Sequence, residues 1–349
     1  MKIPLHVKAR KELTNILNNL LSSFNKYEQN STFIDPAEIK SILIIRPNYR
    51  IGNLIFLTPL INELYKQMPN TKIDVIVGMK LAGEILKPLP NIDKIINIPR
   101  ELLLHPMDMF TFIKETQQKK YDLAINIMGA STSSQLVTSL VNAKYKASYY
   151  NEKSWTRLTH TTELTRCYKH IGLESLELVK LFGIEPPKNP PTLDIKLTQE
   201  EQDLAQKDFD NLISDKKTKT IALFRNARFD KKIADEWWED WIQELRLLNK
   251  NIVIIDILSP DIPTKLNDTV LEYSNKNLRL LGAFFKECDL YVSADTGPMH
   301  LAVASDAKVL ALFNKTSIDA FGALGDKNKT IDINELSAKD VAKITHEFL

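Results

Sequence analysis

The sequence predicts an α/β protein made of two doubly wound domains. Short runs rich in β-branched residues alternate with helical stretches, a pattern typical of a parallel sheet covered by helices. The alternation occurs twice, and between the two series residues 185–191 hold four prolines in seven positions, which neither a helix nor a central strand accommodates. At 349 residues, the chain is long enough for each domain to bury its own core.

The predicted strands form two groups. Residues 41–185 are expected to form the first Rossmann-like domain, residues 186–194 a proline-rich linker, and residues 195–349 the second domain. Sheets of this class bind ligands beyond the carboxyl ends of their strands, so we expect a ligand in a cleft between the domains. The apolar runs interpreted as strands are 41–46, 72–78, 93–98 and 121–128 in the first domain, and 220–224, 252–257, 278–281, 290–294 and 308–313 in the second.

Residues 1–40 precede the α/β pattern and are predicted to be a helical extension. Apolar residues recur at helical spacing at Leu13, Ile16, Leu17, Leu20, Leu21 and Phe24. Residues 1–26 carry five Lys or Arg and a single Glu, and a basic amphipathic helix of this kind can lie on an anionic membrane surface. It can equally pack on the body of the protein, and the sequence leaves both interpretations open.

Composition excludes several classes of function. The chain has 46 Lys and Arg against 44 Asp and Glu, a net charge of +2, which gives no electrostatic case for nucleic-acid binding. Cys167 and Cys288 are isolated, so neither a disulfide framework nor a zinc site is expected. No apolar run is long enough to span a membrane, and the N-terminus does not resemble a secretory signal. We therefore expect a cytoplasmic protein, peripheral to the inner face of the membrane if its N-terminal helix binds there.

The segment 295–300 is the strongest candidate ligand site. Asp295 and Thr296 follow an apolar run, Gly297 permits close approach of the backbone, and Pro298 is favourable at the start of a helix. The N-terminus of such a helix presents N–H groups and a positive dipole end to an anion. His300 lies one turn further on, where it is expected to contact the same anion.

Residues 225–232 follow the first predicted strand of the second domain. Their cations, Arg225, Arg228 and Lys231 among them, are expected to lie opposite the 295–300 turn, and such an arrangement suits a diphosphate. Cations and a helix dipole would take up the charge of a diphosphate leaving group. The next predicted helix carries tryptophans that we assign to the core, at positions 237, 238 and 241.

Polar residues also follow two strands of the first domain. Arg46, Arg50, Gly52 and Asn53 lie after the first strand and are expected to face the ligand cleft, with Thr58 capping the next helix. This turn contains no GxGxxG, so a dinucleotide site is not predicted. The hydroxyls of residues 131–134, including Ser131 and Thr132, suit either a sugar or a helix cap, and capping is favoured for most of them. His105 and His160 lie in or near predicted loops and receive no functional role.

From about Ile42 onward, the sequence resembles the heptosyltransferase family, glycosyltransferase family 9. The most specific string is 295–302, which matches the family's diphosphate-binding segment without a gap. The turn 51–59, the strand 121–129, and Lys231 with Trp238 seven residues later also match family motifs. The resemblance implies a GT-B fold and inverting transfer of a sugar, usually heptose from an ADP donor, to lipopolysaccharide or another cell-surface glycan.

The resemblance also implies roles for individual residues. The donor diphosphate would be held by Thr296, Gly297, Pro298 and His300 with Lys231 and Arg228. Lys231 with Trp238 would form a basic–aromatic motif that contacts the donor phosphates or sugar. Asp295 would orient the loop or donor, Asn53 would lie nearest the transferred sugar, and Arg46, Arg50, Gly52, Ser131 and Thr132 would face the acceptor. No metal or cofactor is expected. The expected partners are a nucleotide-sugar donor, which the resemblance implies to be an ADP sugar, and a glycolipid or glycan acceptor.

The chain departs from the family pattern at three places. Asn53 stands where the family usually has the aspartate that serves as general base, no Lys or Arg lies near Thr132, and only Asp261 can replace the acidic residue that contacts the ribose. Because an amide cannot accept the acceptor's proton, a catalytically silent sugar-nucleotide or glycan-binding protein is the main alternative. A GT-B sugar-nucleotide epimerase is a third interpretation, disfavoured by family motifs in both halves. The sequence does not identify the base of the nucleotide.

Overall fold

The computed structural model describes Glu12 and residues 32–79, 83–98, 106–129, 131–152, 154–215 and 217–349. The predicted amphipathic helix of residues 1–26 therefore lies outside the described residues, apart from Glu12. The chain forms two compact units. Unit 1 comprises Met1–Arg50, Pro59–Cys167 and Leu173–Pro190, and unit 2 comprises Ile51–Thr58, Tyr168–Gly172 and Pro191–Leu349.

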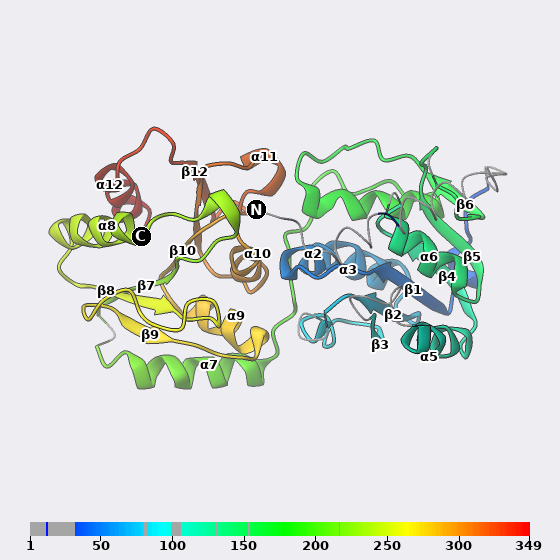
Figure 1. Cartoon of the computed structure of the whole chain (residues 1–349), viewed down its shortest axis with the longest axis horizontal. Coiled ribbons are helices and arrows are strands. Elements are labelled where there is room, and N and C mark those ends of the chain that lie inside the picture. Colours follow the sequence, from blue (N-terminus) through cyan, green and yellow to red (C-terminus); the bar gives the residue numbers. More distant parts are fainter. Residues whose placement is uncertain are drawn as a thin grey trace. The chain divides into compact units, whose positions relative to one another are not determined.

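The sheet of unit 1 has six parallel strands in the order β3-β2-β1-β4-β5-β6 (Figure 1). Its central strand β1 has four consecutive buried residues, as expected for a parallel strand covered on both faces. The elements of this half of the chain are η1 (Pro36–Glu38), β1 (Ser41–Arg46), α2 (Ile51–Ile55), α3 (Thr58–Gln67), β2 (Lys72–Val77), β3 (Ile92–Asn97), α5 (Pro106–Gln117), β4 (Tyr121–Asn126), α6 (Thr132–Leu140), β5 (Ala143–Tyr149), β6 (His160–Thr162) and η3 (Ile171–Phe182).

The sheet of unit 2 also has six parallel strands, in the order β12-β11-β10-β7-β8-β9 (Figure 1). Strands β10 and β11 are buried along their whole length. The elements of this half are α7 (Gln199–Leu212), β7 (Lys219–Phe224), η4 (Phe229–Lys231), α8 (Asp235–Leu248), β8 (Ile252–Ile257), β9 (Leu271–Tyr273), α9 (Leu278–Glu287), β10 (Leu290–Ala294), α10 (Gly297–Ala304), β11 (Val309–Phe313), α11 (Ile318–Phe321), β12 (Lys329–Asp332) and α12 (Ala338–Phe348).

The two sheets share one topology. Counted along the chain within each half, both have the strand order 3-2-1-4-5-6, which is that of doubly wound Rossmann folds. The direction of winding reverses between β1 and β4 in unit 1 and between β7 and β10 in unit 2. Ligands bind outside the carboxyl ends of the strands at such switch points. The predicted α/β fold with two doubly wound sheets is therefore confirmed.

Most predicted strands are confirmed, but one was wrong. Residues 278–281 are the first turn of α9, because the Asn277 side chain accepts hydrogen bonds from Arg279 N and Leu280 N and thereby caps a helix. The short or half-exposed strands β5, β6, β9 and β12 were not predicted. His160, expected in or near a loop, lies in β6 and is buried.

The tryptophans lie in the core of unit 2, as predicted. Trp238 and Trp241 are fully buried on α8, and Trp237 packs against the same cluster from a partly buried position. The indole N–H of Trp241 donates to Thr345 Oγ1 at 3.2 Å, which joins α8 to α12. Trp238 is therefore a core residue, and a direct contact between its ring and a donor, as the resemblance implies, is excluded by this burial.

Two short segments from the first half of the sequence group with unit 2. The Ile51–Thr58 segment contains α2, which packs against α10, and Tyr168–Gly172 leads into η3. Both lie within residues 41–185, the range predicted for the first domain. Among the helices that the structure describes, none combines the length and the apolar character that a membrane span requires.

Candidate functional site

The turn after β10 forms the predicted strand, turn and helix. Thr296 is the N-cap of α10 and its hydroxyl accepts a hydrogen bond from Met299 N at 3.3 Å. The helix begins at Gly297, and Pro298 occupies its second position. Because the cap binds the N–H of Met299 and Pro298 has none, the N–H groups of Thr296 and Gly297 are those that the helix geometry leaves for an anion.

Lys231 lies beside this turn and is held by Asp295. Its Nζ is 2.8 Å from Asp295 Oδ2, and Thr316 Oγ1 donates to the same carboxylate oxygen at 2.7 Å. The Lys231 side chain is 25% exposed while that of Asp295 is 8% exposed, so the lysine is partly open to solvent and the aspartate is largely buried. Asp295 therefore positions Lys231 at the switch point between β7 and β10, and Thr316 in turn fixes Asp295.

Arg225 does not contribute to this anion site, contrary to the prediction. Its side chain is buried, and its guanidinium donates to Asp256 Oδ2 at 3.0 Å, Asp235 Oδ2 at 2.8 Å and the Thr264 carbonyl at 2.5 Å. All three nitrogens are thus committed to unit 2 itself. Arg228, three residues later, is exposed, so its side chain stays a candidate for contact with a ligand.

His300 is buried under the turn. Burial lowers the pKa of its imidazole far below the usual value, with the neighbouring His170 and Lys231 lowering it further and Asp295 opposing them. Its Nδ1 is buried without a hydrogen-bond partner among the described residues. His300 is therefore neutral at physiological pH and can meet a phosphate oxygen by a hydrogen bond from a neutral ring, but not as a cation.

A glycine lets α2 lie directly against the start of α10. A Cβ on Gly52 would lie 2.9 Å from His300 Cδ2, so a side chain at position 52 would require the His300 ring to move. A Cβ on Gly297 would make only an ordinary van der Waals contact, 3.5 Å from Gly52 N. Asn53 is the next residue, half-buried, and its carboxamide has no hydrogen-bond partner in the part of the chain that the structure describes. The fold thus brings Asn53 to the same region of unit 2 as the 295–300 turn.

Two further contacts bind early segments to unit 2 and were not predicted. His170 Nε2 donates to the Gly322 carbonyl at 2.9 Å, and its Nδ1 accepts from Gly172 N at 3.0 Å. Burial lowers the pKa of this ring as well. Thr58, expected to cap α3, instead accepts a hydrogen bond from Asp194 N at 3.2 Å, because it is fully buried against the segment that leads into unit 2. No local pattern in the sequence signals either contact.

In unit 1, Arg46 lies at the carboxyl end of β1. Burial lowers the pKa of its guanidinium to about 10, although Tyr149 and Glu174 act in the opposite direction. Its Nε is buried without a hydrogen-bond partner among the described residues. A buried donor of this kind is costly unless something accepts from it, so Arg46 is the best-supported ligand-binding candidate in unit 1. Arg50 is exposed, and only its backbone N–H is bonded, to Asn48 Oδ1 at 2.9 Å.

The remaining candidates are exposed or locally bonded. Ser131 occupies the N-cap position of α6 without a side-chain capping bond, and its hydroxyl instead lies 3.1 Å from Ser133 Oγ. Thr132 is partly buried at the start of the same helix. Asp261 is exposed in the tight turn that a Ser259–Ile262 bridge closes after β8, and β8 pairs with β7.

Similarity to known proteins covers the segment that contains this turn. The model of "Glycosyltransferase family 9 (heptosyltransferase)" matches residues 262–347, which include the 295–300 turn. A putative lipopolysaccharide heptosyltransferase 4 of Escherichia coli K12 is 28% identical over 185 residues, which cover 51% of this chain and 49% of that protein. The lipopolysaccharide core heptosyltransferase OpsX of Haemophilus influenzae is 22% identical over 290 residues, covering 78% and 79%. In these segments the chain is similar to glycosyltransferase family 9.

Solved structures of family 9 share the fold. E. coli heptosyltransferase WaaC with ADP superposes with a TM-score of 0.73 at 19% identity, covering 88% of this chain and all of that one. A glycosyltransferase family 9 protein from Veillonella parvula gives 0.72 at 17% identity, covering 84% and 86%. These structures establish the GT-B fold. The alignment with the first E. coli relative spans about half of that protein's length, so activity, substrates and partners are treated below as proposals.

Proposed function

We propose that this protein is an inverting glycosyltransferase that moves a heptose or related sugar from a nucleotide diphosphate to a lipopolysaccharide, lipooligosaccharide or other cell-surface glycan. One observation carries the proposal. The Thr296-capped start of α10 and the Asp295-held ammonium of Lys231 lie together at the switch point of the unit 2 sheet. The match of residues 262–347 to the family 9 model and the similarity to curated proteins named as heptosyltransferases support it.

The geometry suits the departure of a diphosphate. As the sugar is displaced, negative charge develops on the oxygen of the leaving group. The positive end of α10 and the Lys231 ammonium are fixed in advance, so they stabilise this charge without reorganising. Because Asp295 is itself a carboxylate and is paired with Lys231, we assign it to positioning Lys231 rather than to contacting phosphate, from which like charge would repel it.

Asn53 restricts how the acceptor hydroxyl can lose its proton. Its carboxamide can orient an acceptor hydroxyl through a hydrogen bond, but it cannot take the proton at neutral pH. We propose that the proton passes to water as the glycosidic bond forms. Arg46, whose guanidinium has an unbonded buried Nε, is our candidate for a direct contact with the acceptor.

Nucleotide binding tests the donor half of the proposal. Because two solved structures of one similar protein, E. coli heptosyltransferase WaaC, are described as complexes with ADP and with ADP-2-deoxy-2-fluoro heptose, we expect ADP to stabilise this protein more than UDP, GDP or CDP. At a hundredfold excess over Kd, a ligand adds about 2.7 kcal/mol, or a rise in Tm of about 5–10 °C for a domain of this size. A thermal-shift panel measures this effect. No stabilisation by any of the four nucleotides would sink the proposal.

Asn53 favours a second candidate function, a sugar-nucleotide or glycan-binding protein without transferase activity. The Asn53→Asp variant separates the two. If the wild type is an active transferase, transfer is measurable without a carboxylate at this position, and the variant changes its rate through general-base catalysis, typically worth about 10²–10⁴-fold. Transfer by the variant alone, with no detectable turnover by the wild type in a donor-hydrolysis or glycan-transfer assay, identifies the binding protein instead.

A further inference from the structure

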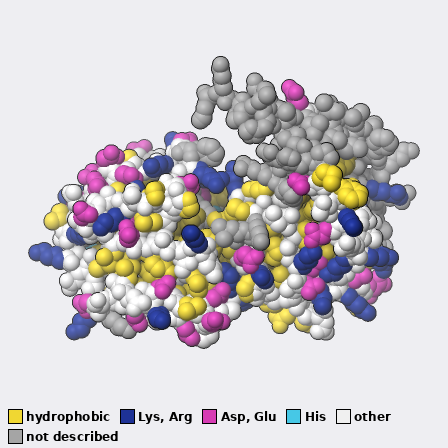
Figure 2. Space-filling model, turned by 60° about the horizontal axis from the view of Figure 1, so that its bottom comes forward, with side chains coloured by type: hydrophobic (Ala, Val, Ile, Leu, Met, Phe, Trp, Pro, Cys, Tyr) yellow, Lys and Arg dark blue, Asp and Glu magenta, His cyan; other side chains and the backbone are white. Residues whose placement is uncertain are grey.

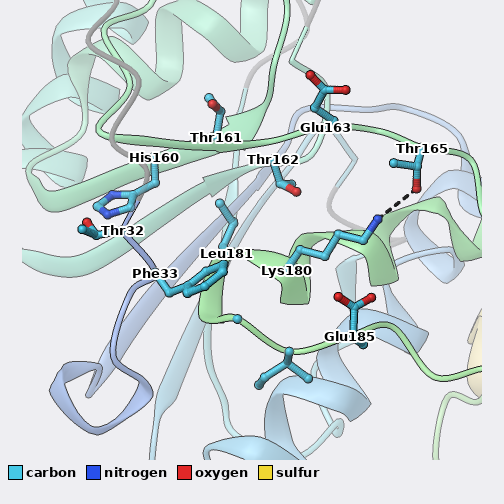
Figure 3. Close-up of a pocket in the computed structure, with 12 residues that line it drawn as sticks. Thr32, Phe33, His160, Thr161, Thr162, Glu163, Thr165, Lys180, Leu181 and Glu185 are labelled. Carbon is cyan, nitrogen blue, oxygen red and sulfur yellow. Dashed lines mark hydrogen bonds between the residues drawn. The ribbon is translucent and has the colours of Figure 1, made fainter.

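Unit 1 contains a pocket away from the carboxyl ends of β1 and β4. It lies between the edge strand β6, the end of η3, and residues 32–33 and 183–185, and has a volume of about 360 Å³ (Figure 3). This volume is at the small end of the range for ligand pockets. The proposed transfer reaction uses none of the residues that line it, so the pocket requires a separate explanation.

An exposed aromatic ring forms one wall of the pocket. Phe33 is 70% exposed, yet the next residue is held in place because Ile34 N donates to the Leu181 carbonyl at 2.9 Å. The ring lies against Gly183, where a Cβ would be 3.2 Å from Phe33 Cγ, and Gly183 has a φ of +72°. Glycine is therefore required for both the turn and the contact. A large apolar ring held in this way is a preformed stacking surface rather than an incidentally exposed side chain.

Polar groups face this ring from the other walls. In Figure 3, Thr162 of β6 points toward the Lys180 and Phe33 side of the strand, with Glu185 on the opposite wall. The Thr162 hydroxyl has no hydrogen-bond partner among the described residues. Lys180 Nζ is fixed by Thr165 Oγ1 at 2.9 Å and by Glu177 at 3.2 Å. The lining of the pocket thus includes the Thr162 hydroxyl, an immobilised ammonium group and a carboxylate in addition to the aromatic ring.

The charges select against an anionic ligand. Glu163 and Glu185 line the pocket, and the single lysine there, Lys180, is already paired with the fully buried Glu177. A phosphate or an acidic sugar would therefore meet excess negative charge. A neutral sugar suits this lining, because the apolar face of its ring can pack on the aromatic side chain and its hydroxyls can both donate hydrogen bonds to the polar groups and accept them. We propose that this pocket binds a neutral sugar unit which, if the proposed function holds, belongs to the glycan acceptor.

Sugar binding to matched variants tests this site. Saturation-transfer NMR with maltose should show binding to the wild type in the millimolar range, and Phe33→Ala should weaken it about 5- to 10-fold, as loss of an aromatic contact predicts. Phe110→Ala is the control, since Phe110 is 66% exposed on α5 of the same unit, and it should bind maltose as the wild type does. Thr162→Val replaces the hydroxyl with a methyl group and should also weaken binding. This variant keeps the site testable if Phe33→Ala proves unstable.

Three results would overturn the site: no maltose binding by the wild type, equal binding by Phe33→Ala and the wild type, or glucuronate binding as tight as that of maltose. The nucleotide panel, run on the same samples, keeps this inference separate from the proposed function. Stabilisation by ADP without maltose binding refutes the sugar pocket alone. Maltose binding that depends on Phe33, without stabilisation by any nucleotide, refutes the proposed transferase and leaves the sugar site standing.

Discussion

Replacing Lys231 with methionine is expected to weaken ADP binding by about 10- to 100-fold, the effect of losing a hydrogen bond to a charged group. Lys231 is partly exposed beside the start of α10, and methionine preserves most of its length while removing the charge. The substitution also leaves the Asp295 carboxylate, only 8% exposed, without its cation and close to the incoming phosphates. Both changes act in the same direction. If the protein is a transferase, kcat/KM should fall further, by about 10²–10³-fold, because the charge of the leaving group grows in the transition state.

Lys219→Met is the matched control for this variant. Lys219 pairs with Asp289 at 2.6 Å, so the same kind of ion pair is removed from the same sheet. It lies at the amino end of β7, however, and Lys231 follows the carboxyl end. Calorimetric titration with ADP at constant ionic strength should therefore show wild-type affinity for Lys219→Met and weak binding for Lys231→Met. Equal affinity of both variants would show that Lys231 does not hold the diphosphate.

The sequence predicted the fold and the central turn because both depend on local patterns. Alternating apolar runs identified the long buried strands, and the 295–300 segment combines an N-cap, a glycine and a proline in consecutive positions. The short edge strands β6 and β9 were missed because each has only three residues, too few for a periodic pattern. The strand predicted at residues 278–281 was wrong because a four-residue apolar run fits either a strand or a helix, and the Asn277 cap favours the helix.

The roles of individual side chains could not be predicted in the same way. Arg225 and Lys231 are six residues apart and both cationic, yet one is buried among carboxylates and the other faces the turn. This difference depends on Asp256, Thr264 and Asp295, which lie far along the chain. The association of α2 with α10 likewise depends on Gly52 lying against His300, a residue more than 240 positions away. Only the folded chain shows which polar groups are already satisfied and which remain available.

Arg225→Met is expected to lower the free energy of unfolding of unit 2 by about 3–5 kcal/mol, the usual effect of removing one partner from a buried ion pair. Arg225 is buried, and Asp256, which it contacts at 3.0 Å, is fully buried. Without the guanidinium, Asp256 keeps only the Leu266 N–H, which donates to it at 2.8 Å. Urea unfolding followed by tryptophan fluorescence reports on this unit, since three of the four tryptophans lie in α8.

Two controls isolate the buried pair. Lys327→Met removes the ion pair with Asp306, whose side chain is 69% exposed in the same unit, and should cost less than about 1 kcal/mol. Arg225→Lys retains a charge but lacks the planar fork that reaches three acceptors, so it should lie between the wild type and Arg225→Met. A loss in Arg225→Met no larger than that in Lys327→Met would contradict the structural role assigned to Arg225.

The pH dependence of Arg225→Met tests the cause of its instability. Burial raises the pKa of Asp256 above its ordinary value even with Arg225 beside it, because the attraction of the guanidinium offsets only part of the burial. Removing Arg225 raises this pKa further, so the folded state binds the proton more tightly than the unfolded chain does. Stability must then increase as the pH falls, and the deficit of Arg225→Met relative to the wild type should shrink from pH 7 to pH 5. A deficit independent of pH would mean that lost packing, rather than an unpaired Asp256 carboxylate, destabilises the variant.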